Sequence, residues 1–420
     1  MNLMKRYIHH KFGEKFNVFS IRMILIFSIL MLINASIPLV SYLAENIGKK
    51  PTISYELKSN PLTQDKVQVK RNVYYIIMDG MMAIETAAQS NITTKKEVLD
   101  YLSNTGLKYV DKSQSSYDHT PMGLASIMLL DYHQRSSSPK FRDLANFFPG
   151  IMDKRHTEVP LISYLKEASS SFFWSGNSWG MCLSSSEWVC INSLNVFFSS
   201  NLIKFFLTTP LPKILKTIFK DIESQNAIGP FLKYIDKNGL PKTPFFAFIH
   251  HNSPHDPHLL TSECEPTMEW VLTKKSHTRN FEGYKASYRC ALKTIPMVMN
   301  KINDIDPEAI VVFQADHGWP SENIKLTKEE LYLDLKYKLQ TSALEYHALQ
   351  KRFEFQGKIF NAIKAPEICF DKYGLPKTNV NTIRFVINCA YGFKLPYRQD
   401  KHYSERLPEN GTVIERTIYE

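Results

Sequence analysis

The sequence predicts an α/β domain in which a mostly parallel or mixed sheet carries helices on both faces. Apolar runs of strand length recur at residues 73–78, 244–250 and 310–314, and buried parallel strands consist of such continuous runs. Segments whose apolar residues have helical spacing separate these runs, as at residues 93–105 and 284–302. Alternating strands and helices are typical of a sheet that helices cover from both sides.

Shorter elements are expected between these segments. Pro121 suits a first helical position, so we expect a helix that begins just past Thr120 and ends near Leu130. Thr327 and Glu330 form a capping box that predicts a long helix at residues 327–355. The remaining predicted elements are a helix at residues 159–167 and strands at residues 107–110, 171–174 and 383–389.

One further apolar segment has two interpretations. Residues 194–220 are amphipathic, rich in Phe and Leu, and interrupted by Pro210 and Pro212. We expect a packed helical insertion into the domain. Contact of this segment with a membrane surface is the alternative.

The chain begins with a candidate membrane anchor. Residues 23–43 carry no charged side chain, and about 20 such residues can cross a bilayer as a helix. Five cations precede this stretch within residues 1–22, which predicts a cytoplasmic N-terminus. A cleaved signal peptide is the alternative, although its apolar region is usually about 7–15 residues long. The expected organisation is a cytoplasmic segment at 1–22, an uncleaved anchor at 23–43, a linker at 44–71 and an exported domain at 72–420.

The six cysteines agree with export. An even number of cysteines in an exported chain suggests disulfides, although six cysteines allow fifteen pairings. Six reduced thiols in a cytosolic protein are the alternative, and a four-cysteine zinc site is disfavoured because no CxxC motif is present. We expect three sequential bridges, which pair Cys182 with Cys190, Cys264 with Cys290, and Cys369 with Cys389.

The net charge of +10 narrows the classes of partner. This charge is compatible with an anionic substrate or an anionic membrane surface. The sequence has neither a basic helix nor a recognised nucleic-acid-binding motif, so nucleic acid is not an expected partner. The composition, 44% hydrophobic and 22% charged, is that of a globular protein.

Three of the apolar runs lead into residues that can bind a metal ion. Asp79 follows the first run, Asp316 and His317 follow the third, and His255 lies in the loop after the second. In open α/β sheets, ligands bind just beyond the carboxyl ends of the strands. Asp and His are common metal ligands, and the glycine after each Asp motif lets the backbone turn away. The pattern predicts a metal site at one edge of the sheet.

Thr120 is the candidate nucleophile of this site. It precedes a predicted helix, whose N–H groups and positive dipole end favour a phosphoryl oxygen. A hydroxyl is a weak nucleophile until a metal ion lowers its pKa. An ordinary threonine N-cap is the alternative interpretation of this residue.

The other polar residues also have structural interpretations. The Asp-Gly and Asp-His-Gly sequences can be turns that follow a strand. His251, His255 and His258 lie close together and can be loop residues. Of these, we expect His255 to be functional and His258 to be a second candidate for substrate binding. We expect His119, next to Thr120, to be structural.

These segments resemble the alkaline phosphatase and sulfatase superfamily. The resemblance is carried by NVYYIIMDG, LKYVDKSQSSYDHTPMGLASIM, FFAFIHHNSPHDPH and VVFQADHG, and NVNTIRFVINCAYGFKLP is similar to a C-terminal segment of one branch. That branch contains membrane-anchored sulfatase-like proteins related to lipoteichoic acid synthases and phosphoethanolamine transferases. The likeness spans residues 72–403 and implies an alkaline-phosphatase-like three-layer sandwich.

The resemblance also implies a reaction and the residues that perform it. Asp79, Thr120, Asp316 and His317 would bind one divalent ion, Thr120 would be the nucleophile, and His255 would bind substrate. Such ligands suit Mn²⁺ or Zn²⁺, with Mg²⁺ as the less favoured ion. The implied enzyme transfers a phosphoethanolamine- or phosphoglycerol-type group to a cell-envelope glycan or lipid through a phosphothreonine.

Two features separate this chain from parts of the superfamily. Sulfatases mature a Cys or Ser in a Cys/Ser-x-Pro-x-Arg motif, whereas Thr120 is followed by Pro121 and no nearby Arg, which disfavours sulfate-ester hydrolysis. The lipid-using transferases carry several transmembrane helices, whereas one is expected here. The alternatives to transfer are therefore a phosphodiesterase or phosphatase with the same site, and a degenerate protein that binds an envelope polymer without catalysis.

The expected location is the inner, cytoplasmic membrane. A single span at residues 23–43 would leave the sulfatase-like catalytic domain on the periplasmic, extracytoplasmic side. The expected partners are the membrane and an envelope glycan or lipid substrate. The sequence makes no prediction of the oligomeric state.

Overall fold

A computed structural model describes residues 70–132, 159–176, 188–192, 227–256, 258–267, 278–319, 353–405 and 413–417. All of these residues belong to one compact unit, Leu57–Glu420. Among them, no helix has both the length and the apolar character that a membrane crossing requires. Several predictions fall wholly or largely outside the described residues: the anchor at 23–43, the linker at 44–71, the insertion at 194–220 and the helix at 327–355.

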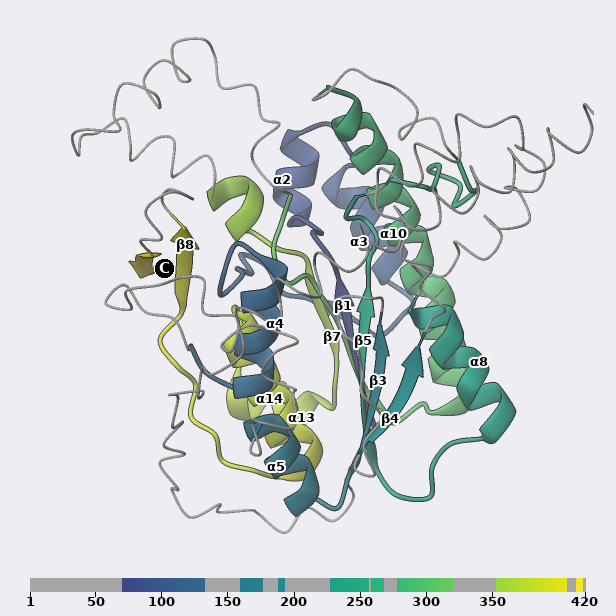
Figure 1. The fold of residues 1–420 in the computed structure, drawn as a ribbon, viewed down its shortest axis with the longest axis vertical. Helices are drawn as coiled ribbons and strands as arrows, with labels where there is room; N and C mark the ends of the chain where they lie inside the picture. The colour runs from purple at the N-terminus through teal and green to yellow at the C-terminus, as the bar shows by residue number, and fades with distance from the viewer. Residues whose placement is uncertain are drawn as a thin grey trace, which may run out of the picture. The chain divides into compact units, whose positions relative to one another are not determined.

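The domain is built around a mixed, mostly parallel sheet of seven strands (Figure 1). Five neighbouring strands, from β6 to β4, run parallel, and β7 is antiparallel to both β6 and β2. The predicted α/β sheet is thereby confirmed. The order across the sheet is β2 (Lys108–Tyr109), β7 (Asn361–Lys364), β6 (Ile310–Gln314), β1 (Val73–Met78), β5 (Phe245–His251), β3 (Ser171–Gly176) and β4 (Trp188–Asn192).

Helices cover both faces of this sheet, which gives the predicted three layers (Figure 1). One face carries α4 (Thr120–Leu129), α5 (Pro160–Glu167), α13 (Glu367–Tyr373) and α14 (Asn379–Tyr391). The other face carries α2 (Ile84–Gln89), α3 (Lys95–Leu102), α8 (Ile228–Asn238) and α10 (Thr278–Ile305). The remaining elements are a π-helical turn (Phe353–Gly357) before β7 and a ribbon of β8 (Lys401–Glu405) and β9 (Val413–Thr417).

Strand β1 shows how the apolar runs position the polar residues that follow them. All six of its residues are 0% exposed, because strands flank it on both sides and helices cover both faces. Burying a side chain such as Ile or Met contributes roughly 1.5–3 kcal/mol, so this strand is firmly held. Its register pairs Met78 with His251 of β5 and Ile77 with Gln314 of β6. The three strands therefore end at the same level.

The predicted strand at residues 383–389 is wrong, because these residues lie within helix α14. All 13 residues of α14 are buried, so its apolar run shows no one-sided helical period and resembles a buried strand. The helical signals lie outside the run. The Thr378 side chain caps the helix by accepting the N–H of Asn381, and Gly392, with φ of 77°, ends it.

Among the described residues, two disulfides connect elements of the domain. Cys264–Cys290 joins the loop after β5 to α10, and Cys369–Cys389 joins α13 to α14. Both pairings are among the three favoured from the sequence. The third predicted pairing includes Cys182, which lies outside the described residues.

Replacement of both Cys369 and Cys389 by alanine is expected to lower the free energy of unfolding by about 3 kcal/mol. A crosslink between cysteines separated by 20 residues restricts the unfolded chain by about this amount. Denaturant unfolding of the oxidised protein, followed by tryptophan fluorescence, measures the loss. An unchanged unfolding midpoint would show that the bridge adds nothing to the stability of the fold.

Candidate active site

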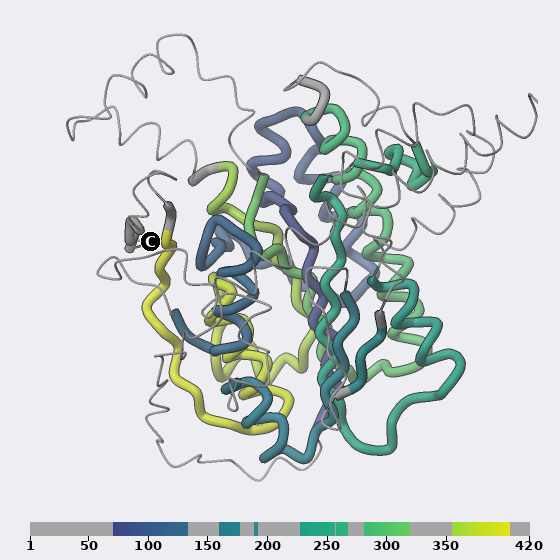
Figure 2. Tube along the Cα trace, in the orientation of Figure 1, coloured from purple at the N-terminus to yellow at the C-terminus, as the bar shows by residue number. Residues whose placement is uncertain are grey.

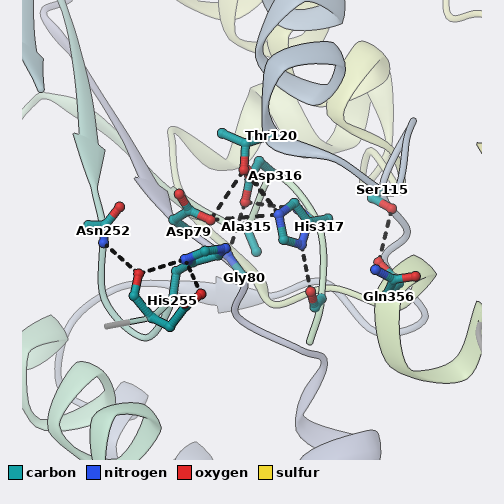
Figure 3. Close-up of polar contacts among 12 residues, drawn as sticks. Asp79, Gly80, Ser115, Thr120, Asn252, His255, Ala315, Asp316, His317 and Gln356 are labelled. Atoms are coloured by element: carbon teal, nitrogen blue, oxygen red, sulfur yellow. Dashed lines mark hydrogen bonds and ion pairs between the residues drawn. The ribbon is translucent and has the colours of Figure 1, made fainter. Parts of the chain in front are cut away.

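The predicted site residues meet at the carboxyl edge of the sheet (Figure 3). Asp79 directly follows β1, and Asp316 and His317 follow β6 after a single intervening residue. Thr120 begins α4, the helix that lies over this edge. All four residues are buried, with at most 6% of any of them exposed. Segments separated by up to about 240 residues of sequence therefore form one compact polar group.

Thr120 directs its hydroxyl at Asp79 and His317 (Figure 3). Its Oγ1 lies 3.4 Å from Oδ1 of Asp79 and 3.0 Å from Nε2 of His317. The N-cap of α4 is His119, whose carbonyl oxygen accepts the N–H of Gly123 at 2.9 Å. The interpretation of Thr120 as an ordinary N-cap is therefore wrong, and its hydroxyl belongs to the polar group.

The His317 ring presents a lone pair to Thr120. Its Nδ1 lies 2.6 Å from the carbonyl oxygen of Gly318, which can only accept, so Nδ1 carries the proton. In the neutral ring, Nε2 is then an acceptor, and it also lies 3.7 Å from Oδ1 of Asp79. A metal-binding histidine has this arrangement, with one nitrogen donating to a carbonyl and the other facing the ion.

Gly318 is required for this arrangement. A Cβ at position 318 would lie 1.9 Å from the carbonyl oxygen of Phe355. The Gly318 N–H donates to the carbonyl oxygen of Gln356 at 2.7 Å, which holds the backbone in this close approach. The glycine therefore allows the chain after His317 to pack directly on the turn before β7.

Asp316 has one bonded and one unpartnered carboxylate oxygen. Its Oδ1 accepts the N–H of Gly80 at 3.1 Å and the N–H of His317 at 2.9 Å. Its Oδ2 is buried without a hydrogen-bond partner among the described residues. It lies 3.7 Å from Nε2 of His317, and a bound cation would offset the cost of burying this oxygen without a hydrogen bond.

His250 is the member of the site that the sequence analysis missed. It is the next-to-last residue of β5, is 0% exposed, and places Nε2 3.2 Å from Oδ2 of Asp79. This approach lacks hydrogen-bond geometry, and neither ring nitrogen has a hydrogen-bond partner among the described residues. The available signal was an imidazole inside an apolar strand, because buried polar groups normally have a partner or a ligand.

His255 and His258 occupy different surroundings. The Nδ1 of His255 lies 2.8 Å from the carbonyl oxygen of Asp256, and its ring meets that of His317 at a centroid distance of 6.0 Å. His258 is buried and stacks on Trp319 at 5.6 Å. Of the two predicted histidines, only His255 is among the donor groups that could hold a metal ion.

The ligand-type atoms form two groups that share Asp79. One group contains Asp79, His255 and His317, and the other contains Asp79, His250 and Asp316. Within each group, the donor atoms lie within 4.8 Å of one another. Imidazole and carboxylate donors of this kind suit Zn²⁺ or Mn²⁺. Nδ1 of His250 and Oδ2 of Asp316 are buried without hydrogen-bond partners among the described residues, which is independent evidence that these residues fit a cation.

The pKa values follow from burial and from the mutual contacts of these residues. Burial raises the pKa of Asp79, but the nearby imidazoles outweigh it and hold that pKa well below its usual value. Burial lowers the pKa of His255, but Asp79 and Asp256 outweigh it and raise the pKa to about 10. Burial lowers the pKa of His251 and of His258 to about 4. At neutral pH an ionised Asp79 thus lies beside a cationic His255, while His251 and His258 are neutral.

Known proteins share this architecture. The family model described as Sulfatase matches residues 71–356. No curated protein matches the chain in sequence. The C-terminal periplasmic domain of EcEptC from Escherichia coli, in complex with Zn, is 11% identical with a TM-score of 0.50, over 84% of this chain and 95% of that chain. The periplasmic domain of phosphoethanolamine transferase EptC from Campylobacter jejuni is 12% identical with a TM-score of 0.45, over 78% of this chain and 90% of that chain.

The two kinds of match support different conclusions. At such low identity, the similarity to the Escherichia coli structure shows a shared fold and leaves the substrate open. The family match covers more than half of the chain, and its span contains every residue of the polar group described above. The chain is therefore an enzyme of the Sulfatase family, within the alkaline phosphatase superfamily.

Proposed function

We propose that this Sulfatase-family enzyme is a metal-dependent phosphotransferase whose nucleophile is Thr120. The observation that carries the proposal is the position of Thr120 Oγ1, 3.0 Å from His317 Nε2 within a buried group of ligand atoms. When bound there, a divalent cation lowers the pKa of the hydroxyl and offsets charge on the transferred group. Asp79, His250 and Asp316 form one group of ligand atoms that would hold the cation. His317 shares Asp79 with them through the other group, and its Nε2, 3.7 Å from Oδ1 of Asp79, would join them beside Thr120.

The reaction divides into two displacements at phosphorus. In the first, Thr120 Oγ1 forms a bond to phosphorus while the bond to the leaving alcohol breaks. Thr120 loses one proton and the departing alcohol takes up one, so the step is balanced. In the second, an acceptor hydroxyl displaces Thr120, which regains a proton. Water as the acceptor gives hydrolysis, whereas a hydroxyl of a glycan or lipid gives transfer.

His255 belongs to the substrate side of this mechanism. Its side chain is 27% exposed, compared with 5% for His317 and 3% for Asp79, so it faces the open side of the site. With a pKa of about 10, its ring is cationic at neutral pH. A cationic imidazole is a suitable hydrogen-bond donor to an anionic phosphoryl oxygen.

The sequence around Thr120 favours phosphoryl over sulfuryl transfer. Residues 120–124 are Thr-Pro-Met-Gly-Leu, which lack both the Cys or Ser and the Arg of the motif that sulfatases mature. An unmodified threonine hydroxyl next to a metal site can form a phosphoester in one displacement. This chemistry needs no modification of the nucleophile.

We further propose that the enzyme acts outside the cytoplasm on a cell-envelope glycan or lipid. The two disulfides support an oxidising compartment, because reduced thiols are the rule in the cytosol. The net charge of +10 suits an anionic membrane surface or substrate. The predicted anchor at residues 23–43 would keep the catalytic domain at that surface.

Thr120→Ala is expected to reduce turnover of bis(p-nitrophenyl) phosphate by roughly 10³-fold or more, because the variant lacks the attacking oxygen. Intact-mass measurement should show a phosphoryl-type adduct on the wild type and none on the variant. Ser126→Ala is the matched control, since Ser126 is a buried hydroxyl of the same helix that donates to the carbonyl oxygen of Gly123. Turnover or an adduct that survives in Thr120→Ala would overturn the assignment of the nucleophile.

The same assay separates transfer from hydrolysis. Release of nitrophenol that depends on an added envelope glycan or lipid indicates transfer, whereas release with water alone indicates a hydrolase. If a correctly folded wild type loaded with Zn²⁺ releases no nitrophenol, either with the added acceptor or with water alone, the proposed phosphotransferase activity is contradicted.

Asp316→Asn is expected to abolish the thermal stabilisation of the protein by Zn²⁺. The variant keeps the oxygen that accepts the N–H groups of Gly80 and His317 but loses the charge at Oδ2. A ligand at 100 times its dissociation constant stabilises the folded state by about 2.7 kcal/mol, which a melting curve resolves. Asp306→Asn is the control, because Asp306 precedes β6 at the other end and bonds Asn72. Equal Zn²⁺ stabilisation of both variants would contradict the assigned site.

A further inference from the structure

One buried side chain joins the segment that carries the nucleophile to the segment that carries the cation ligands. Asn379 is the first residue of α14 and is 0% exposed. Its Oδ1 accepts the N–H of Ser116 at 2.8 Å, and its Nδ2 donates to the carbonyl oxygen of Ala315 at 2.8 Å. Ser116 lies four residues before Thr120, and Ala315 directly precedes Asp316. These two hydrogen bonds, which we call the Asn379 bridge, therefore join the loop before Thr120 to the segment that carries Asp316.

The Asn379 carboxamide has only one orientation that satisfies both partners. The backbone N–H of Ser116 requires an acceptor, and the carbonyl oxygen of Ala315 requires a donor. A flipped amide would place two donors together at one end and two acceptors at the other. Because a buried unsatisfied polar group costs about 1–3 kcal/mol, the side chain acts as a spacer of fixed length and direction.

The helix turn that carries Asn379 is itself fixed to the sheet. Thr378 caps the helix by accepting the N–H of Asn381 at 3.3 Å. One turn further on, the hydroxyl of Thr382 accepts a hydrogen bond at 2.8 Å from Gln314, the last residue of β6. Figures 1 and 2 show α14 beside α4, the helix of the nucleophile, and the two helices are in contact. Asn379 thus projects from a rigid base.

A second feature, the close approach of α4 to the end of β6, affects the same spacing. Gly123, one turn into α4, packs on the backbone of Asp316, and a Cβ at Gly123 would lie 3.1 Å from the Asp316 carbonyl oxygen. Because Gly123 has no side chain, α4 can lie this close to the end of β6, and any larger residue there would push the two apart. The Asn379 bridge opposes movement of the loop before α4 away from the end of β6. Together, the two contacts define the position of Thr120 relative to the ligands.

We propose that Asn379 is a positioning residue, which sets the Thr120 hydroxyl against Asp316 and His317 and thereby controls both cation affinity and turnover. Asn379 bonds only to backbone groups of the two segments and does not touch the reacting atoms. Its effect on turnover rests on the proposed function. Its effect on cation affinity does not, because the ligand geometry is the same whatever group is transferred.

The test compares Asn379→Ala with Asn388→Ala. Asn388 lies in the same helix, is 2% exposed, and makes two hydrogen bonds of 2.8 Å to the backbone of Leu395, a residue of the loop after α14. Both variants lose a buried carboxamide with two backbone partners, so similar losses of thermal stability are expected. Only Asn379→Ala removes the link between the two site segments.

Asn379→Ala is expected to weaken Zn²⁺ binding by about 10–100-fold in a competition titration with a chromophoric chelator. With saturating Zn²⁺, kcat for bis(p-nitrophenyl) phosphate should fall by about 10²-fold with little change in KM, because a misplacement of about 1 Å has this effect. Asn388→Ala should keep wild-type affinity and kcat. Equal Zn²⁺ affinity and kcat in the two variants would overturn the proposal.

Asn379→Asp provides a second variant that preserves the side-chain volume, in case the alanine variant does not fold. Its ionised carboxylate can accept from Ser116 but would face the carbonyl oxygen of Ala315, whereas the protonated form can donate to that oxygen. Its kcat relative to wild type should therefore fall as pH rises from about 6 to about 9, as a buried carboxyl ionises. A ratio that stays near 1 over this whole range would count against the bridge. If the wild type does not turn over the phosphodiester, the proposed function fails, and the Zn²⁺ affinities of Asn379→Ala and Asn388→Ala still decide the role of Asn379.

Discussion

The register of three parallel strands is the constraint on which the site depends. Because β6, β1 and β5 end at the same level, Asp316, Asp79 and His250 reach one edge of the sheet without any special loop. The strands are buried on both faces, so their register is held by the packing of the whole domain. A slip of one residue would turn the ligands away from each other. The packing that stabilises the sheet therefore also sets the geometry of the site.

Burial of polar site atoms without hydrogen bonds costs free energy, and the stability of the rest of the fold offsets this cost. Oδ2 of Asp316 and both ring nitrogens of His250 are buried without hydrogen-bond partners among the described residues. Such groups oppose folding unless a cation or a charged partner compensates them. The fold tolerates them because the surrounding apolar strands and the two helical layers contribute most of the stabilisation. Unpartnered ligand atoms of this kind are what a binding site for a cation requires.

The second helical layer completes the site by positioning the nucleophile. Thr120 begins α4, and α4 is placed by contacts with α14 and with the backbone at Asp316. In this arrangement the strands supply the charged ligands, while α4 and α14 supply and orient the hydroxyl. The Asn379 bridge connects these two parts. Helix α14, which is buried along its whole length, therefore contributes to the site although its residues lie far from the others in sequence.

Apolar runs and the residues that end them are local features, so the sequence alone predicts strands β1, β2, β3, β5 and β6, helices α3, α4, α5 and α10, and the grouping of Asp79, Thr120, Asp316 and His317. The strand at Ile310–Gln314 was predicted with its bounds, and Asp79, Asp316 and His317 were recognised at strand ends. Three features were visible only in the three-dimensional structure: residues 383–389 are helical, His250 faces Asp79, and Asn379 joins Ser116 to Ala315. These features depend on which surfaces are buried and on contacts between residues distant in sequence. A pattern of neighbouring residues does not by itself determine either of them.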